Sequence, residues 1–225
     1  MARAAEATAV RPGAALARRR EPLVLLAVGF VLLVWSGLHP RDRFTWLLEI
    51  APILIAAPIL VVTSRRFPLT PLAYRLILIH AGILMLGGHY TYARVPLGVW
   101  MEQVFGFTRN HYDRIGHLAQ GFVPAILVRE VLRRKTPLPA GGWVFFLTTC
   151  VCLAVSACYE FVEWGTALAS GSAATDFLGT QGDPWDTQWD MQLALIGSIV
   201  SLMLLSGVQD RQLAASLRAS AGSSS

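Results

Sequence analysis

The chain of 225 residues is strongly apolar, because 54% of its residues are hydrophobic and only 15% are charged. Soluble domains carry roughly 25% charged residues, so this composition excludes an ordinary soluble protein and predicts a membrane protein. The net charge of +5 raises the question of nucleic-acid binding, but the basic residues stand at the ends of apolar runs, where they determine membrane orientation. We therefore expect a membrane-lipid environment and no nucleic-acid partner, and the sequence names no protein partner.

Six apolar runs, each close to the roughly 20 residues that a bilayer requires, predict transmembrane helices. They cover approximately residues 22–38, 47–63, 72–88, 115–132, 143–164 and 190–208. The predicted fold class is all-α, a polytopic membrane protein built as a bundle of six transmembrane helices. Residues 1–21 are rich in Ala and Arg without apolar periodicity, and they predict a disordered cytoplasmic tail. The predicted membrane domain then covers residues 22–208, and residues 209–225 form a second cytoplasmic tail.

The distribution of Lys and Arg predicts the orientation of these helices in a bacterial inner (plasma) membrane. With the N-terminus inside, the inner segments hold 14 of the 19 basic residues, so the positive-inside rule puts both termini in the cytoplasm. Acidic residues have the opposite bias, since 10 of the 14 lie in outer segments. The inner side then has 14 basic and 4 acidic residues, and the outer side has 5 basic and 10 acidic residues. The polar clusters of the chain are therefore expected to face outward.

The stretch 109–117, Arg-Asn-His-Tyr-Asp-Arg-Ile-Gly-His, concentrates ionisable residues where an apolar run begins. On a helix over 113–132, Asp113, His117 and Gln120 lie at i, i+4 and i+7, which places them on one face. An ionisable side chain costs at least ~2.5 kcal/mol near the centre of a bilayer. This face is therefore predicted to point into the bundle, where it forms part of a site.

Helix capping explains some of the polar residues but not all of them. Two pairs match an N-cap followed by an acid in the first turn, namely Asn110 with Asp113 and Asp183 with Asp186. His117 and Asp190 lie about one turn further in, past the backbone N–H groups that a cap satisfies. Capping has no use for these two side chains, which we therefore interpret as site residues.

Glu160 and Glu163 fall near the C-terminal end of the run 143–164, where the helix dipole disfavours negative charge by ~0.3–1 kcal/mol each. Something must offset this cost: a bound cation, a neighbouring His or Arg, or protonation of one carboxyl group. Both acids lie on a stripe of small and polar residues that suits helix packing, so they are expected to point into the bundle. His80, near the middle of the run 72–88, is open to either an interhelical hydrogen bond or a role in a site.

Four long motifs occupy the polar segments of the chain. They are His89-Tyr-Thr-Tyr-Ala-Arg-Val-Pro-Leu-Gly98, Arg109-Asn-His-Tyr-Asp-Arg114, Tyr159-Glu-Phe-Val-Glu-Trp164 and Gly179-Thr-Gln-Gly-Asp-Pro-Trp-Asp-Thr-Gln-Trp-Asp-Met191. Together they resemble the YjdF-like family of bacterial inner-membrane proteins over roughly residues 23–208. That resemblance implies an uncharacterised multi-pass inner-membrane protein.

A looser resemblance concerns the acidic and imidazole side chains themselves. Asp113-x-x-x-His117, a glutamate at the end of the next span, and Asp186-x-x-x-Asp190 are similar to the VanZ-like group, whose named member is associated with teicoplanin resistance. This chain has Asp190 where that group has Asn, and it has no Lys or Arg between residues 136 and 210, where that group has a loop Arg.

The sequence thus predicts an outward-facing pocket of Asp, Glu and His, with three interpretations open. The pocket binds or processes an envelope lipid or precursor headgroup, or it belongs to a proton- or cation-coupled permease, or its acids only stabilise a non-catalytic envelope or assembly factor. Whether the protein is an enzyme stays open.

The predicted catalytic residues are His117, Glu163, Glu160 and Asp190. The predicted substrate-binding residues are Arg109, Asn110, His111, Arg114, His89 and Tyr92. A divalent cation is the candidate cofactor, with Asp113, His117, Glu160, Asp186 and Asp190 as its predicted ligands.

Overall fold

The structure is a computed structural model, and it describes residues 12–170 and 175–221. The described residues form helices joined by loops, with no strand among them. The helices are, in chain order, α1 (Pro12–Gly37), α2 (Arg43–Thr63), α3 (Pro71–Tyr90), the 3-10 helix η1 (Tyr92–Arg94), α4 (Pro96–Phe105), α5 (Tyr112–Lys135), α6 (Gly142–Ser170), α7 (Thr175–Leu178) and α8 (Asp186–Ala221).

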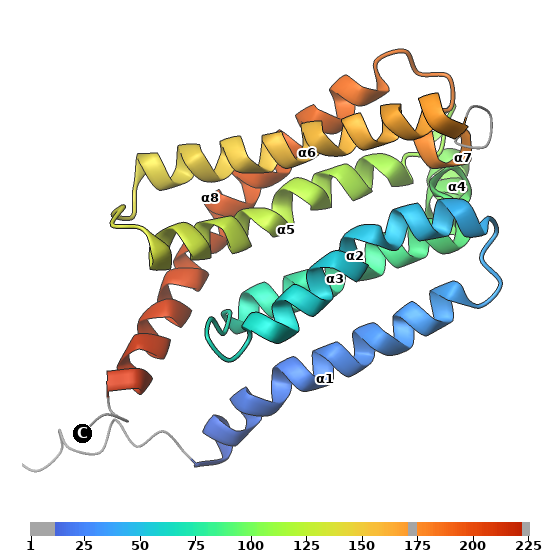
Figure 1. Cartoon of the computed structure of the whole chain (residues 1–225). Coiled ribbons are helices and arrows are strands. Elements are labelled where there is room, and N and C mark those ends of the chain that lie inside the picture. The colour runs from blue at the N-terminus through green and yellow to red at the C-terminus, as the bar shows by residue number, and fades with distance from the viewer. Residues whose placement is uncertain (1–11, 171–174, 222–225) are drawn as a thin grey trace, which may run out of the picture.

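Six of these helices, α1, α2, α3, α5, α6 and α8, are long and apolar enough to cross a membrane. This confirms the all-α fold class and the predicted bundle of six spans. The six helices alternate in direction (Figure 1), so α4 and α7 lie together at one end of the bundle, which we call the α4/α7 end. The start of α1 and the end of α8 lie at the other end, which we call the opposite end.

Several helices extend beyond the predicted spans. Helix α1 begins at Pro12, within the predicted tail 1–21, and residues 1–11 lie outside the described residues. Helix α8 begins at Asp186 and continues to Ala221, through most of the predicted tail 209–225. Hydropathy marks only the part of a helix that suits the bilayer core, and polar extensions of the same helix carry no such signal.

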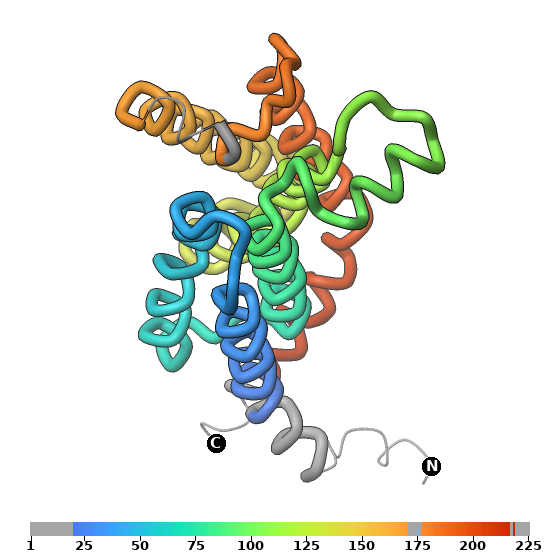
Figure 2. Tube along the Cα trace, turned by 90° about the vertical axis from the view of Figure 1, so that its right-hand side faces the viewer, coloured from blue at the N-terminus to red at the C-terminus, as the bar shows by residue number. Residues whose placement is uncertain are grey.

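The bundle has two layers (Figures 1 and 2). Figure 2 looks onto the α4/α7 end, with α1, α2 and α3 in the lower part of the view and α5 and α6 in the upper part, while α8 runs from the top down one side. Helix α3 packs on both α1 and α2, and it meets α5 between the layers. Helix α2, in contrast, has no extensive packing on α5 or α6 within the described part of the chain.

The most extensive helix pair in the bundle is α5 with α8. Two glycines allow the close approach of these helices. A Cβ atom on Gly121 would collide with the carbonyl oxygen of Ala194, and a Cβ atom on Gly197 would collide with the carbonyl oxygen of Leu118. Small residues at such crossings are the usual basis of helix packing in membranes. The α5/α8 interface therefore brings the polar residues of the two helices within contact distance.

Candidate functional site

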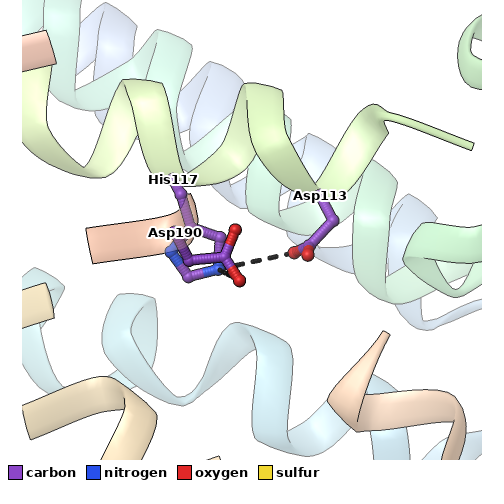
Figure 3. Close-up of side chains that lie close together, drawn as sticks. All are labelled: Asp113, His117 and Asp190. Atoms are coloured by element: carbon purple, nitrogen blue, oxygen red, sulfur yellow. Dashed lines mark ion pairs between the residues drawn. The ribbon is translucent and has the colours of Figure 1, made fainter. Parts of the chain in front are cut away.

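His117 lies at the centre of a buried polar cluster near the α4/α7 end. Its Nε2 atom is 3.5 Å from Asp113 Oδ1 and 3.8 Å from Asp190 Oδ2. Its Nδ1 atom is 3.0 Å from Gln120 Oε1 and 3.9 Å from Glu160 Oε1. Figure 3 shows Asp113 pointing toward the imidazole ring, with Asp190 beside the ring. We call Asp113, His117, Glu160, Glu163 and Asp190 the His117 cluster.

Each member of the cluster is positioned by its place on a helix. Asp113 lies in the first turn of α5, where the helix dipole favours an acid, and His117 follows one turn later on the same face. Glu160 and Glu163 share one face of α6, three residues apart. Asp190 lies in the second turn of α8. Because α5 packs on both α6 and α8, the predicted catalytic residues meet in space.

Several atoms in this cluster and on the face of α6 that leads to it are buried without a hydrogen-bond partner in the described part of the chain. They include Asp190 Oδ1, Glu160 Oε1 and the hydroxyl oxygen of Ser156. No Lys or Arg among the described residues forms an ion pair with a carboxylate of the cluster. A buried carboxylate is costly unless it is paired or protonated. The compensation must therefore come from His117, from protons or from a group that is not part of the chain.

A cavity of about 440 Å³ extends from the cluster, which is within the roughly 300–1,000 Å³ that is typical of ligand sites. Acidic, imidazole and phenol groups line one end, namely Glu49, Asp113, His117, Glu163, Tyr92 and Tyr159. Apolar side chains line much of the rest, and they include Ile53, Leu60, Ile77, Leu84, Val123 and Leu127. His80 and Gln120 also reach the cavity wall. The space is therefore polar at one end and mainly apolar along its length.

Glu49 is a member of this site that the sequence interpretation missed, since it counted this residue only as one of the outer acids. The side chain is buried in α2, and its carboxylate lies beside the hydroxyl groups of Tyr92 and Tyr159. Burial, together with nearby Glu49, raises the pKa of Tyr92, which keeps its hydroxyl group protonated. A single acid inside the apolar run 47–63 was the available signal, because ionisable residues within a span usually face a site.

The predicted substrate-binding arginines do not line the cavity. Arg109 donates hydrogen bonds to Asp186 at 2.7 Å and to Asp183 at 3.3 Å. Arg114 donates to Asp183 at 2.8 Å. These ion pairs join the start of α5 and the residues just before it to the start of α8 and the residues just before it. Asp186, a predicted cation ligand, is paired with Arg109 and does not belong to the His117 cluster.

The capping prediction was wrong in register for both helices. The N-cap residue of α5 is His111, which makes no capping hydrogen bond, and Asn110 stands one residue earlier. Asn110 Oδ1 accepts a hydrogen bond from the backbone N–H of Tyr112. Asp183 stands three residues before α8, and its Oδ1 accepts from the backbone N–H of Trp185. Both side chains therefore stabilise the turn that precedes the helix, which is common for Asn and Asp.

His89, in the last turn of α3, and His111, just before α5, were predicted to bind substrate, and they also lie outside the cavity lining. The ring of His111 packs edge-on against Phe107. Nδ1 of His89 lies 3.0 Å from the carbonyl oxygen of Ser36. Of the six predicted substrate-binding residues, Tyr92 alone lines the cavity, and a binding role for the other five stays a prediction.

Two groups of three side chains have ligand atoms close enough together to hold one metal ion. In each group the ligand atoms lie within 4.8 Å of one another. His117 belongs to both groups, which are Asp113, His117 and Asp190, and His117, Glu160 and Glu163. These groups contain four of the five predicted ligands, with Glu163 present and Asp186 absent.

Six membrane-length helices around a buried polar centre define an integral, multi-pass membrane protein. The chain belongs to the family described as "Predicted membrane protein (DUF2238)", which it matches over residues 21–211. It is 47% identical over 201 residues to the inner membrane protein YjdF of Escherichia coli (strain K12), an alignment that covers 88% of this chain and 96% of that protein. No solved structure matches the chain. The predicted membership of the YjdF-like family is thereby confirmed.

Proposed function

We propose that the protein binds an amphipathic envelope lipid or lipid-linked precursor in this cavity and processes its headgroup. The acyl part lies along the apolar wall, and the headgroup lies at the His117 cluster. One observation carries the proposal: a single cavity joins a cluster of ionisable side chains to an apolar channel wall. A polar solute has no need of the apolar length, and acids that only cross-link helices have no need of a cavity.

The position of α2 supports entry of such a ligand directly from the bilayer. Helix α2 packs on α3 but not extensively on α5 or α6 within the described residues. Ile59 of α2 and Val155 of α6 both line the cavity, and both are among the exposed hydrophobic side chains. A lipid therefore exchanges sideways between α2 and α6, and its acyl chain does not have to enter water.

Glu163 is the acid–base group of the proposed reaction. It lines the cavity where a headgroup lies, and a carboxyl group in that position can give or take the proton of the reacting bond. His117 lines the same end of the cavity, and Glu160 and Asp190 lie beside its two nitrogen atoms, where they orient the ring. The headgroup bond that reacts lies within reach of Glu163 and His117.

We also propose that the α4/α7 end faces outward, as the bias in Lys and Arg predicts. The start of α1 and the end of α8 then lie on the cytoplasmic side (Figure 1). Reporter fusions test this orientation: a fusion at Ser225 is expected to report a cytoplasmic location, and a fusion between residues 165 and 185 an external one. An external reading at Ser225 contradicts the orientation and the outward position of the site together.

Lipid binding is tested with variants that fill the cavity. Leu84 lines the cavity, so Leu84→Trp occupies space that the acyl chain needs. Leu204 is exposed on α8, and Leu204→Trp is the matched control. Purified wild type and control are expected to retain the same lipid, identified by mass spectrometry, and Leu84→Trp is expected to lose it. Equal lipid content in all three proteins contradicts the proposal.

Headgroup processing is tested in cells. Lipids and envelope precursors are compared between a deletion strain and strains that express the wild type or His117→Ala at matched levels. The deletion is expected to accumulate the unprocessed lipid, and only the wild type is expected to restore the normal profile. Restoration by His117→Ala removes the reaction from the proposal and leaves binding alone.

A further inference from the structure

We infer that Asp113, His117 and Asp190 bind a divalent cation. The inference deepens the proposed function, because it names an occupant for the polar end of the same cavity. The role of that cation in headgroup chemistry rests on the proposed function. Cation binding itself does not, since the three side chains belong to the chain and their geometry involves no lipid.

The three ligand atoms converge from two helices. Asp113 Oδ1 and Asp190 Oδ2 lie 3.5 and 3.8 Å from His117 Nε2, and all three atoms are within 4.8 Å of one another (Figure 3). Tetrahedral ligands at about 2.0–2.2 Å from a metal ion are separated from one another by about 3.3–3.6 Å. The two distances from His117 Nε2 are therefore close to those of a metal shell.

The hydrogen bond on the other side of the ring prepares His117 for this role. Gln120 Oε1 lies 3.0 Å from Nδ1, and an amide oxygen can only accept, so Nδ1 donates. The neutral ring then directs the lone pair of Nε2 toward the carboxylates of Asp113 and Asp190. Metal-binding histidines typically donate their second ring N–H to such an acceptor, which fixes the tautomer and orients the ring.

The charges around the site call for a cation that the chain does not supply. Asp190 Oδ1 is buried without a hydrogen-bond partner among the described residues, and the residue is 1% exposed. The guanidinium groups of Arg109 and Arg114, just before α5 and in its first turn, are engaged by Asp186 and Asp183. Buried carboxylates that lack an ion pair are stabilised by metal coordination. A divalent ion at this point provides that compensation.

Two carboxylates and one imidazole form a ligand set that suits Zn²⁺ or Mn²⁺. Three protein ligands leave coordination positions for water or substrate. An ion at this site therefore attracts a negatively charged oxygen, such as that of a phosphate, which the carboxylates alone repel. The expected substrate class is accordingly a lipid whose headgroup carries a phosphate.

Purified full-length protein in detergent tests the site without added lipid. The protein is stripped with a chelator and titrated with Zn²⁺ or Mn²⁺, and the bound metal and the unfolding temperature are measured. Wild type is expected to bind one ion per chain and to unfold at a higher temperature when it is loaded. Asp190→Asn and Asp113→Asn are expected to weaken binding about tenfold or more. Asp210→Asn, which removes an acid on α8 that pairs with Arg129, is the control and is expected to bind normally.

Two results overturn the inference: wild type that neither retains an ion nor changes its unfolding temperature, or Asp190→Asn that binds as tightly as wild type. If the aspartate variants do not fold, the bound metal and the unfolding temperature of chelated and loaded wild type still show whether the protein binds an ion. Leu84→Trp separates this inference from lipid binding, because it leaves all three ligands in place. Normal ion binding by a Leu84→Trp protein that retains the same lipid as wild type contradicts the lipid proposal alone.

Discussion

Two buried polar clusters lie on α5, one toward each end of the helix, and they differ in how their charges are compensated. At the opposite end, Glu130 is fully buried and accepts hydrogen bonds from the backbone and hydroxyl groups of Thr70. It also accepts from Arg134 at 2.8 Å and from Gln209 at 3.3 Å. At the α4/α7 end, Asp190 is equally buried, and its Oδ1 has no such partner among the described residues.

Arginine completes the cluster around Glu130. Arg129 donates two hydrogen bonds of 2.9 Å to the carboxylate of Asp210 and one of 2.7 Å to Gln209 Oε1. Arg133 donates to the same carboxylate at 3.1 Å. We call Thr70, Glu130, Arg129, Gln209 and Asp210 the Glu130 cluster. It joins the start of α3 to α5 and α8, and its charges are paired within the chain.

The contrast separates stability from function. A buried charge that is fully paired holds helices together, and removal of one partner leaves the other unsatisfied. A buried charge that the protein leaves unpaired contributes no such stability, so another requirement must account for it. On this basis we interpret the Glu130 cluster as a structural clamp, and we propose that a ligand or cation completes the His117 cluster.

The largest expected effect is the loss of the structural clamp. Glu130→Ala leaves Thr70, Gln209 and Arg134 without their acceptor, so we expect a loss of about 3–5 kcal/mol in the free energy of unfolding. Unfolding in detergent by denaturant or heat measures it. The matched control is Glu163→Ala on α6, for which we expect little change. Equal losses in the two variants would show that both clusters are structural, which contradicts the comparison.

A second change acts on the interface that carries both clusters. In Gly121→Val the new side chain meets the backbone of Ala194, and we expect α8 to shift away from α5 at a cost of about 1–3 kcal/mol. Gly207→Val is the control, because a Cβ atom at Gly207 meets nothing within 4 Å. Thermal unfolding and ion binding are measured on both variants. A Gly121→Val protein with wild-type stability contradicts the close α5/α8 packing.

Substitutions in the His117 cluster are expected to change the free energy of unfolding by less, and in the opposite direction. Asp190→Asn is nearly isosteric and removes one charge from a crowded group of acids. In chelated, ion-free protein we therefore expect stability to be unchanged or raised by on the order of 1 kcal/mol, while activity in the cellular assay is lost. Glu163→Gln is expected to behave in the same way. If both variants unfold instead, these carboxylates are structural partners of His117, and the assembly-factor interpretation replaces the enzyme.

The sequence predicted the spans and most of the His117 cluster because both follow from helix geometry. Residues four apart on one helix share a face, so Asp113 and His117 were placed together correctly. An acid past the first turn of a helix has no cap to make, which marked Asp190. The prediction that the polar faces of α5, α6 and α8 meet required one further expectation, that charged helix faces avoid lipid.

The missed features depend on contacts between distant segments. Arg109 and Arg114 resembled ligand-binding residues, but Asp183 and Asp186, some 70 residues later, engage them. Their pairing could not be read from spacing within one helix. Glu49 was missed because its apolar run indicated only a span, and its partners Tyr92 and Tyr159 lie on other elements. The Glu130 cluster likewise forms only when α3, α5 and α8 meet.

The smallest expected effect is a dependence of stability on pH that originates at the α4/α7 end. Burial and the neighbouring guanidinium groups of Arg114 and Arg109 hold the pKa of His111 below its usual value, and the Glu130 cluster contains no histidine. Below the usual histidine pKa of about 6.5, the unfolded chain binds a proton that folded His111 resists, so stability falls as the pH is lowered.

The unfolding temperature, measured from neutral pH down to about pH 5, is therefore expected to fall less steeply in His111→Phe than in wild type. Phe preserves the edge-on contact with Phe107 and removes the titrating group. The difference between the two proteins isolates His111 from His117, which both proteins retain. A steeper fall in His111→Phe means that protonated His111 stabilises the loop, and the nearby arginines are then not the dominant charges around it.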